Sequence, residues 1–324
     1  MLPNGQRLGA HLPLATGMVR AADRAAAIGA SAIQVFVDNP TSWRRRPGLP
    51  AELPAFRDRL AHHGIAPVSV HAPYLVNLAA PADEVWVRSV ELLTSELRVA
   101  AAYGAAFVNV HIGSHRGSGV DTGIARLAKG LLSVVEHAGT AGDSVLVVLE
   151  NGSGAGFGLG TTPGELGAID RAATAIGVPR DRLGFCLDTA HLWAAGHDIG
   201  SLEGADAVLA AFDTQVGLDR LRMVHLNDSR SGMGTGSDRH EHLGGGRIGI
   251  GGLARFLQHP DLGHVTYILE TPGMEEGWDE VNLARARDLA AGRPLAALPP
   301  SAFDTRSARG RSAPPEADAP ADVS

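Results

Sequence analysis

The sequence is poor in cysteine, in lysine and in long apolar runs. Its 324 residues include one cysteine, Cys186, and one lysine, Lys129. A single cysteine excludes a disulfide framework and any zinc finger built on several thiolates. No stretch of 18 uncharged apolar residues occurs, so no segment is expected to span a bilayer. The first residues lack an apolar run followed by a cleavage site, so we expect no signal peptide and a cytoplasmic setting.

The overall charge is acidic, with 35 Asp and Glu residues against 28 Lys and Arg residues and a net charge of −7. This balance argues against a protein that coats nucleic acid without specificity. Hydrophobic residues make up 44% of the chain and charged residues 19%, which is enough apolar material for a large core and excludes global disorder. Histidine is abundant by comparison, with 14 copies, and its placement is the most informative feature of the sequence.

Strand-like apolar runs alternate with helix-like segments rich in alanine and leucine, such as Ala82–Tyr103 and Gly119–His137. This alternation predicts a parallel sheet. Eight strand-and-helix units fit a closed (β/α)₈ TIM barrel, which typically takes roughly 250 residues or more, whereas an open doubly wound sheet usually has fewer strands. The predicted strands are Arg7–Leu14, Ser31–Phe36, Ala66–Tyr74, Phe107–Gly113, Ser144–Asn151, Arg182–His191, Arg220–Asp228 and His264–Pro272.

We therefore predict one α/β domain over residues 1–300 and a separate tail over residues 301–324. The tail is rich in Ala, Pro, Ser, Arg and Asp and has no apolar periodicity. Such a composition cannot bury enough apolar surface to offset the entropy of ordering, so we expect the tail to be disordered.

Six residues of metal-ligand type end six successive predicted strands. They are His71, His111, Glu150, Asp188, His225 and Glu270, at separations of 40, 39, 38, 37 and 45 residues. Each separation is one strand-and-helix unit, so a barrel would bring all six to the rim where its strands end, which is where TIM barrels build their active sites. Polar residues commonly end strands, but Gly, Asn or Ser would serve that purpose equally well.

Three more candidate ligands follow nearby, namely His191, Asp238 and His240. Asp238 and His240 are two residues apart, so their side chains point the same way if the loop is extended. Nitrogen and carboxylate ligands without thiolate suit zinc, with manganese as an alternative at one position. One zinc ion takes about four ligands, so nine residues with some sharing suffice for three ions. Three divalent cations would outweigh the four carboxylates and make the mouth attractive to a phosphodiester.

Several motifs give the sequence a family resemblance. They are GAH at Gly9–His11, VHAPYLVNLA at Val70–Ala79, NVHIGSH at Asn109–His115, LEN at Leu149–Asn151, CLDTAHLWAAGHDI at Cys186–Ile199, HLNDS at His225–Ser229, DRHEHLGGGRIG at Asp238–Gly249 and LETP at Leu269–Pro272. With these motifs the sequence resembles the endonuclease IV family of zinc-dependent apurinic/apyrimidinic endonucleases. The resemblance covers about residues 7 to 292 in family order, and the set is specific although each motif alone is weak.

The resemblance implies a TIM barrel with three zinc ions. By residue-for-residue matching, the first ion would be held by His71, His111 and Glu150, the second by Glu150, Asp188, His225 and Glu270, and the third by His191, Asp238 and His240. Glu150 would bridge two ions and is the candidate catalytic residue. Asn151, Asn227 and Asp228 are placed where they could orient the ligands.

The implied reaction is hydrolysis of double-stranded DNA on the 5′ side of an abasic site, which leaves a 3′-hydroxyl and a 5′-deoxyribose phosphate. Removal of 3′-blocking groups is also implied, and we expect the enzyme to act as a monomer. Tyr74 and Leu75 match the pair that the family inserts into bent DNA, at a cost of a few kcal/mol of unstacking. The other candidate DNA contacts are Trp43, Arg44, Arg45 and Arg239.

Two positions depart from the family pattern. Thr41 stands where an arginine that fills the gap in bent DNA is often found, and Ala155 stands where a glutamine is usual. Thr41 is too short to fill the same volume, although the arginines at 44–46 could compensate by gripping phosphates. A non-catalytic lesion-binding protein, which keeps the metals but has lost productive bending of DNA, is therefore one alternative.

A second alternative is a sugar isomerase or epimerase of the xylose-isomerase-like kind, for which Glu150, Asp188, His225 and Glu270 alone would make a single-metal site. The five remaining ligand candidates argue against it. The run Gly244–Gly249 matches the GxGxxG pattern of dinucleotide sites but does not directly follow a strand. A phosphate-binding loop after the seventh strand is the other interpretation of this run.

Overall fold

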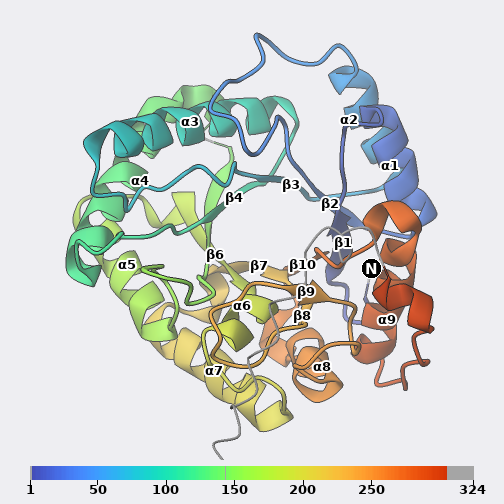
Figure 1. The fold of residues 1–324 in the computed structure, drawn as a ribbon. Coiled ribbons are helices and arrows are strands. Elements are labelled where there is room, and N and C mark those ends of the chain that lie inside the picture. The colour runs from blue at the N-terminus through green and yellow to red at the C-terminus, as the bar shows by residue number, and fades with distance from the viewer. Residues whose placement is uncertain (1, 143, 305–324) are drawn as a thin grey trace, which may run out of the picture.

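The computed structural model describes residues 2–142 and 144–304. Over these residues eight parallel strands close into a barrel, and helices surround it (Figure 1). The strands are β1 (Arg7–His11), β2 (Ala32–Val35), β3 (Val68–His71), β4 (Phe107–His111), β5 (Leu146–Glu150), β6 (Leu183–Asp188), β7 (Leu221–His225) and β10 (Thr266–Leu269). Each predicted strand contains one of them, and the predicted TIM barrel is confirmed.

The helices outside the barrel are α1 (Met18–Ala27), α2 (Leu53–His63), α3 (Asp83–Ala102), α4 (Val120–Gly142), α5 (Pro163–Ala175), α7 (Leu202–Gln215), α8 (Ile250–Gln258) and α9 (Trp278–Ala290). Local signals explain where several begin. Asp83 and Glu84 lie in the first turn of α3, where acidic residues favour the positive end of the helix dipole. Thr162 caps α5 by accepting a hydrogen bond from the backbone N–H of Glu165.

The predicted strands run past the observed ends. Five of the observed strands, β3 to β7, end at one of the predicted ligand residues, and the chain turns after it. The clearest case is β6, which we predicted to continue to His191. Instead, the Asp188 side chain accepts a hydrogen bond from the backbone N–H of His191 at 2.9 Å. This interaction caps a short helix, α6 (Thr189–Ala194). His191 therefore lies on the first turn of a helix rather than on a strand.

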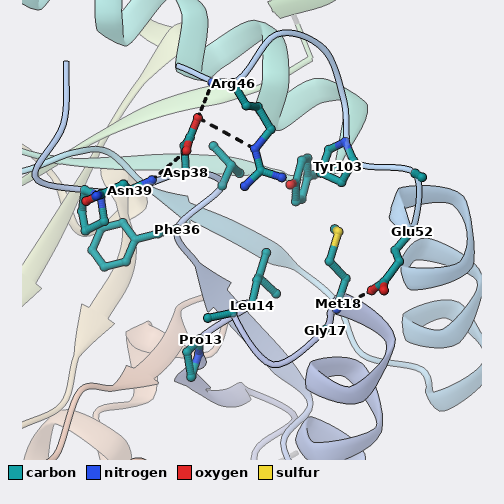
Figure 2. Close-up of a pocket in the computed structure, with 15 residues that line it drawn as sticks. Pro13, Leu14, Gly17, Met18, Phe36, Asp38, Asn39, Arg46, Glu52 and Tyr103 are labelled. Carbon is teal, nitrogen blue, oxygen red and sulfur yellow. Dashed lines mark hydrogen bonds and ion pairs between the residues drawn. The ribbon is translucent and has the colours of Figure 1, made fainter. Parts of the chain in front are cut away.

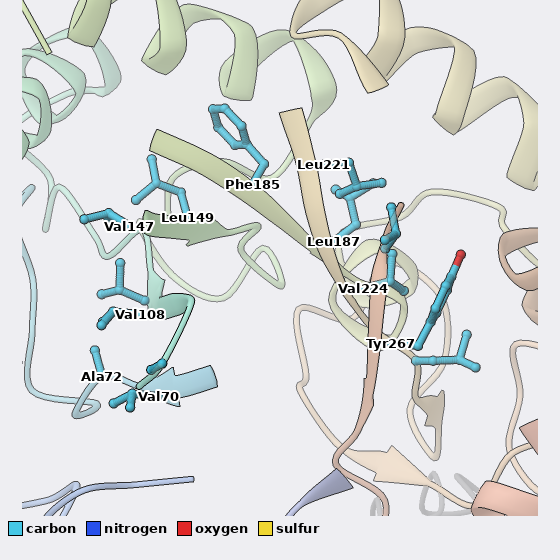
Figure 3. Close-up of a cluster of buried hydrophobic side chains, with 14 of the residues drawn as sticks. Val70, Ala72, Val108, Val147, Leu149, Phe185, Leu187, Leu221, Val224 and Tyr267 are labelled. Carbon is cyan, nitrogen blue, oxygen red and sulfur yellow. The ribbon is translucent and has the colours of Figure 1, made fainter. Parts of the chain in front are cut away.

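Side chains alternate between the two faces of the barrel wall, and the two faces have different cores. Outward-facing residues such as Val147, Leu149 and Phe185 pack beneath the helices (Figure 3). A small inner cluster is formed by Ala32, Val148, Cys186, Met223 and Ile268. Because a strand repeats every two residues, the positions two residues further along these strands also face inward, one layer nearer the carboxyl ends.

The chain continues beyond α9 and lies back against the barrel. Arg285 donates to the carbonyl of Ala296 at 2.6 Å, and Ala302 is fully buried within the turn Pro300–Phe303. Residues 301–304 were assigned to the predicted tail and instead pack against the domain, while residues 305–324 lie outside the described part of the chain. None of the described helices has the length and apolarity needed to cross a membrane.

Candidate metal centre

Every strand of the barrel places one polar side chain at its carboxyl end, and we call this set the inner ring. Its members are His11, Gln34, His71, His111, Glu150, Asp188, His225 and Glu270. Four of them, on β2, β5, β6 and β7, stand two residues after a member of the apolar inner cluster, and Glu270 does so directly after β10. Because strand side chains repeat every two residues, these polar groups form a layer next to the apolar inner cluster, which we call the apolar floor. All six predicted strand-end ligands lie in this ring.

The first group of ligand atoms comes from His71, His111 and Glu150, which approach within 4.8 Å of one another. Nε2 of His71 lies 3.5 Å from Glu150 Oε2, and Nε2 of His111 lies 3.8 Å from the same oxygen. These separations are longer than hydrogen bonds and match atoms arranged around a shared centre. The predicted first ligand set is therefore brought together.

The second group contains Glu150, Asp188, His225 and Glu270, again with ligand atoms within 4.8 Å. Nδ1 of His225 lies 3.3 Å from Glu150 Oε1 and 3.3 Å from Glu270 Oε2. Glu150 therefore presents one oxygen to the first group and the other to the second, as a bridging ligand must.

The third group lies toward the loop between β7 and α8. His191, His240 and Asp188 bring ligand atoms within 4.8 Å, and Asp238 places its oxygens 3.1 Å from His191 Nε2 and 3.0 Å from His240 Nε2. His240 belongs to a two-stranded ribbon of β8 (Asp228–Ser229) and β9 (His240–Glu241). Asp188 reaches both the second and third groups, a sharing that the sequence did not indicate.

Hydrogen bonds to backbone carbonyls fix the orientation of three imidazoles. The Nδ1 atoms of His71, His191 and His240 contact the carbonyl oxygens of Ala72 at 2.7 Å, Asn151 at 3.0 Å and Glu270 at 3.0 Å. A carbonyl only accepts, so each Nδ1 carries a proton and donates it. When such an imidazole is neutral, as a metal ligand must be, the lone pair lies on Nε2, which points at the carboxylates.

Asparagines support the carboxylates. Asn109 donates to Glu150 Oε2, and Asn227 donates to Asp188 Oδ2 at 2.8 Å while accepting from the backbone N–H of Glu270. Asn151 accepts from the backbone N–H of Asp188 at 2.7 Å. Asn151 and Asn227 were predicted to orient ligands, whereas Asn109 was missed. The signal for it was its position two residues before His111 on β4, which places it on the same face of the strand.

Asp228 has a different role from the one expected. Its carboxylate accepts hydrogen bonds from the backbone N–H groups of Gly244, Gly246 and Ile248, at 2.9 to 3.0 Å. A glycine-rich loop binds phosphate through such N–H groups, but here an internal carboxylate occupies them. The interpretation of Gly244–Gly249 as a phosphate-binding loop is therefore wrong, and Asp228 anchors the loop instead.

The charges of the third group depend on one another. Burial acts to lower the pKa of His240, but the carboxylates of Asp188 and Asp238 outweigh it and raise the pKa to about 9. Burial likewise acts to raise the pKa of Asp238, but hydrogen bonds from His191 and His240 hold it below its usual value. Asp238 is thus ionised at neutral pH, which is its ligand form, and a divalent cation would displace the protons that the imidazoles of His191 and His240 carry.

The donor atoms of the site and their unpaired state are suited to divalent cations. In the described part of the chain, Glu150 Oε1 and His225 Nδ1 are buried without a hydrogen-bond partner. Leaving buried polar atoms unpaired costs about 1–3 kcal/mol each, yet both atoms point into the second group. Nitrogen and oxygen donors without sulfur suit zinc or manganese.

The candidate DNA contacts fall into two sets. Tyr74 is 58% exposed, and its ring lies 5.9 Å from that of His111, so it stands at the mouth of the ligand groups. Arg44 and Arg239 are exposed on the loops after β2 and β7, and Leu75 is half-buried beside Tyr74.

Two other candidates from the loop after β2 turn inward. The guanidinium of Arg45 forms an ion pair with buried Glu96 at 3.0 Å, and Trp43 is half-buried beneath the guanidinium of Arg88. Thr41 donates locally to Asn39. Arg45 and Trp43 therefore shape the loop from within, while Arg44 projects from it.

A separate pocket of about 560 Å³ opens beside the inner ring, between the loops after β1 and β2 (Figure 2). It shares Phe36 with the site, since the Phe36 ring lies 5.2 Å from that of His71. Its acids are engaged in local structure: Asp38 accepts from the backbone of Arg46 at 2.7 Å, and Glu52 accepts from the backbone of Met18 at 2.7 Å. We assign the pocket no chemistry of its own.

The sequence and the fold of this chain both match known proteins. A family model described as xylose isomerase-like TIM barrel matches residues 22–290. The probable endonuclease 4 of Methanoculleus marisnigri is 39% identical over 283 residues, covering 87% of this chain and 98% of the relative. The crystal structure of endonuclease IV from Thermus thermophilus superposes with a TM-score of 0.76 at 39% identity, covering 88% of this chain and 99% of the other. A D-tagatose 3-epimerase-like protein, at 18% identity and a TM-score of 0.65, covering 89% of this chain and 99% of the other, shares the fold alone.

The fold and the site define a xylose isomerase-like TIM barrel with grouped metal-ligand residues. Within that class, the chain belongs to the endonuclease IV family.

Proposed function

We propose that this protein is a DNA-repair endonuclease that hydrolyses the phosphodiester on the 5′ side of an abasic site, leaving a 3′-hydroxyl and a 5′-deoxyribose phosphate. Three divalent cations would serve the reaction, zinc at each position or manganese at one. The observation that carries the proposal is the linkage of three ligand groups through two shared carboxylates, Glu150 and Asp188. Removal of 3′-blocking groups would use the same site, since it is also phosphodiester hydrolysis.

When bound, such cations make water a stronger nucleophile and offset the negative charge that develops on phosphate oxygens. The chain supplies the geometry. Glu150 holds the first and second groups in one frame, and Asn109 fixes the Glu150 carboxylate by donating to Oε2. Asp188 ties the second group to the third, which would lie beside the departing 3′-oxygen. Burial of these acids keeps bulk water from screening their charges.

Recognition of double-stranded DNA would come from the loops around the mouth. Tyr74 and Leu75 are placed to enter the distorted duplex, and Arg44 and Arg239 to contact phosphates. Trp43 and Arg45 would act by holding the loop that carries Arg44. We propose that one chain suffices, because all three ligand groups lie within it.

The decisive experiment combines metal analysis with incision of an abasic-site duplex by the same preparation. We expect close to three divalent ions per chain and a nick on the 5′ side of the lesion. About one ion per chain without incision would favour a sugar isomerase or epimerase. Three ions with tight binding of the duplex but no cleavage would favour a lesion-binding protein, in which Thr41 and Ala155 have cost the ability to bend DNA productively.

A further inference from the structure

Gln34 is a member of the inner ring that no ligand group includes. It lies on β2, paired in register with His11 of β1 and Ser69 of β3, and it is fully buried. The other fully buried polar residues of the ring, Asp188 and His225, both belong to a ligand group. A buried amide must satisfy both its oxygen and its nitrogen, so what Gln34 contacts is informative.

Both ends of the Gln34 amide contact ligands of the second group. Its Oε1 lies 3.1 Å from Nε2 of His225, and its Nε2 donates to Glu270 Oε1 at 2.7 Å. Because a carboxylate only accepts, the end of the amide that faces Glu270 is the nitrogen, and Oε1, to which Ser69 also donates at 3.3 Å, is the acceptor. Nδ1 of His11 lies 3.0 Å from the same Glu270 oxygen, so this oxygen is engaged on the side away from His225.

The polarity of these contacts matches what a cation at the second group requires. Nδ1 of His225 faces Glu150, Asp188 and Glu270, so it must be unprotonated to bind a metal ion. A neutral imidazole then carries its proton on Nε2, and Gln34 Oε1 is the acceptor that holds it there. The amide nitrogen engages Glu270 Oε1 and leaves Oε2, which lies 3.3 Å from His225 Nδ1, free for the ion.

We infer that Gln34 is a positioning residue that sets the tautomer of His225 and selects the Glu270 oxygen that faces the metal. It does for His225 what backbone carbonyls do for His71, His191 and His240. The inference rests on the proposed metal site and extends it to a residue outside the ligand groups. A glutamate at this position would keep the acceptor for His225 but set a second negative charge against Glu270, and a methionine would keep the volume and lose both hydrogen bonds.

The test compares Gln34→Met with Gln6→Met. Gln6 is also a buried glutamine whose amide nitrogen donates to Leu262 O at 2.9 Å, but it precedes β1 at the opposite end of the barrel. The two variants therefore make the same chemical change at similar burial. Zn²⁺ affinity is measured by competition with a chelator, the spectrum of the Co²⁺-loaded protein reports coordination geometry, and Tm reports stability.

We expect Gln34→Met to weaken the binding of one of the three Zn²⁺ ions by about 10- to 100-fold, as is typical when a metal ligand loses its supporting hydrogen bond. The Co²⁺ spectrum should change as well. Gln6→Met should lower Tm to a similar degree and leave Zn²⁺ affinity and the Co²⁺ spectrum unchanged. Gln34→Glu should also weaken Zn²⁺ binding, and it provides the test if Gln34→Met fails to fold.

Wild-type Zn²⁺ affinity in the Gln34 variants would overturn the inference. Equal losses in Gln34→Met and Gln6→Met, in step with their loss of Tm, would also overturn it, because Gln34 would then act only through general stability. Zn²⁺ binding is measured without DNA, so the result is independent of incision. Failure of the wild-type protein to cleave DNA would count against the proposed function and not against the role of Gln34.

Discussion

Two regions of the candidate metal centre are built in different ways. The first and second ligand groups stand on or directly beside barrel strands, and the side chains of Glu150 and His225 are 1% and 0% exposed. The third group draws on the first turn of α6 and on the long loop between β7 and α8, where the Asp238 side chain is 43% exposed. The period and register of the strands fix the positions of the first and second groups, whereas the position of the third group depends on local hydrogen bonds.

Hydrogen bonds from neighbouring segments hold the loop that carries the third group. Asp228 gathers the glycine-rich segment that follows His240. His242, two residues after His240, is buried and contacts the carbonyl of Ala302 at 2.8 Å, so the chain beyond α9 braces the loop from behind. The strand-borne groups should therefore tolerate surface changes, and the loop-borne group should be the first to lose its ion.

The largest effect should follow a change in the carboxylate that joins the two strand-borne groups. Glu150→Gln removes the bridging charge while keeping the shape of the side chain. We expect incision of an abasic-site duplex to fall by at least about 10³-fold, because removal of even one transition-state contact commonly costs 10²–10³. Single-turnover kinetics on a labelled duplex would measure the loss.

The barrel core does not include Glu150, so circular dichroism and Tm should remain close to wild type for Glu150→Gln. Cleavage at nearly the wild-type rate would show that the catalytic carboxylate has been assigned to the wrong residue.

A smaller effect should follow a change in the loop-borne group. Asp238→Asn leaves His191, His240 and Asp188 in place but removes a carboxylate whose oxygens lie 3.0 and 3.1 Å from the two imidazoles. We expect one ion of three to be lost on dialysis and incision to fall by about 10²-fold. Metal analysis by mass spectrometry checks the count. Loss of all three ions together would mean that the two regions do not behave as separate units.

The smallest effect should come from the rim, outside both groups. Arg44→Ala should weaken binding of the abasic duplex by less than about 10-fold and reduce the slope of log K against log salt by about 1, as expected when one phosphate contact is lost. Arg59→Ala is the matched control, because Arg59 is exposed on α2 and pairs with Asp23 at 3.3 Å. If both variants keep the wild-type slope, the loop after β2 is not part of the DNA interface.

The contrast between strand-borne and loop-borne groups also explains which features of the site could be predicted from the sequence. The strand-borne ligands were predictable because one unit of a barrel has a nearly constant length, so regular spacing carries spatial information. The apolar run extends the sixth predicted strand to His191, whereas His191 lies in a short helix, because capping by Asp188 depends on a side-chain contact that an apolar pattern does not encode.

Gln34 and Asn109 escaped notice because their role lies in contacts between strands far apart in sequence. The sharing of Asp188 and the inward turn of Arg45 escaped for the same reason, since each depends on a partner that only the closed barrel brings near. Spacing along the chain indicates which residues reach the rim, but it does not give the hydrogen-bond partner of each one.

Cys186 gives the protein a built-in reporter. It is the only thiol in the sequence, it is fully buried in the apolar floor beneath Glu150 and Asp188, and burial raises its pKa to about 12. A thiol in this state is protonated and out of reach of alkylating reagents. Its rate of alkylation would therefore follow how often the barrel opens. Comparing that rate by mass spectrometry with and without bound cations would show how far the cations suppress opening.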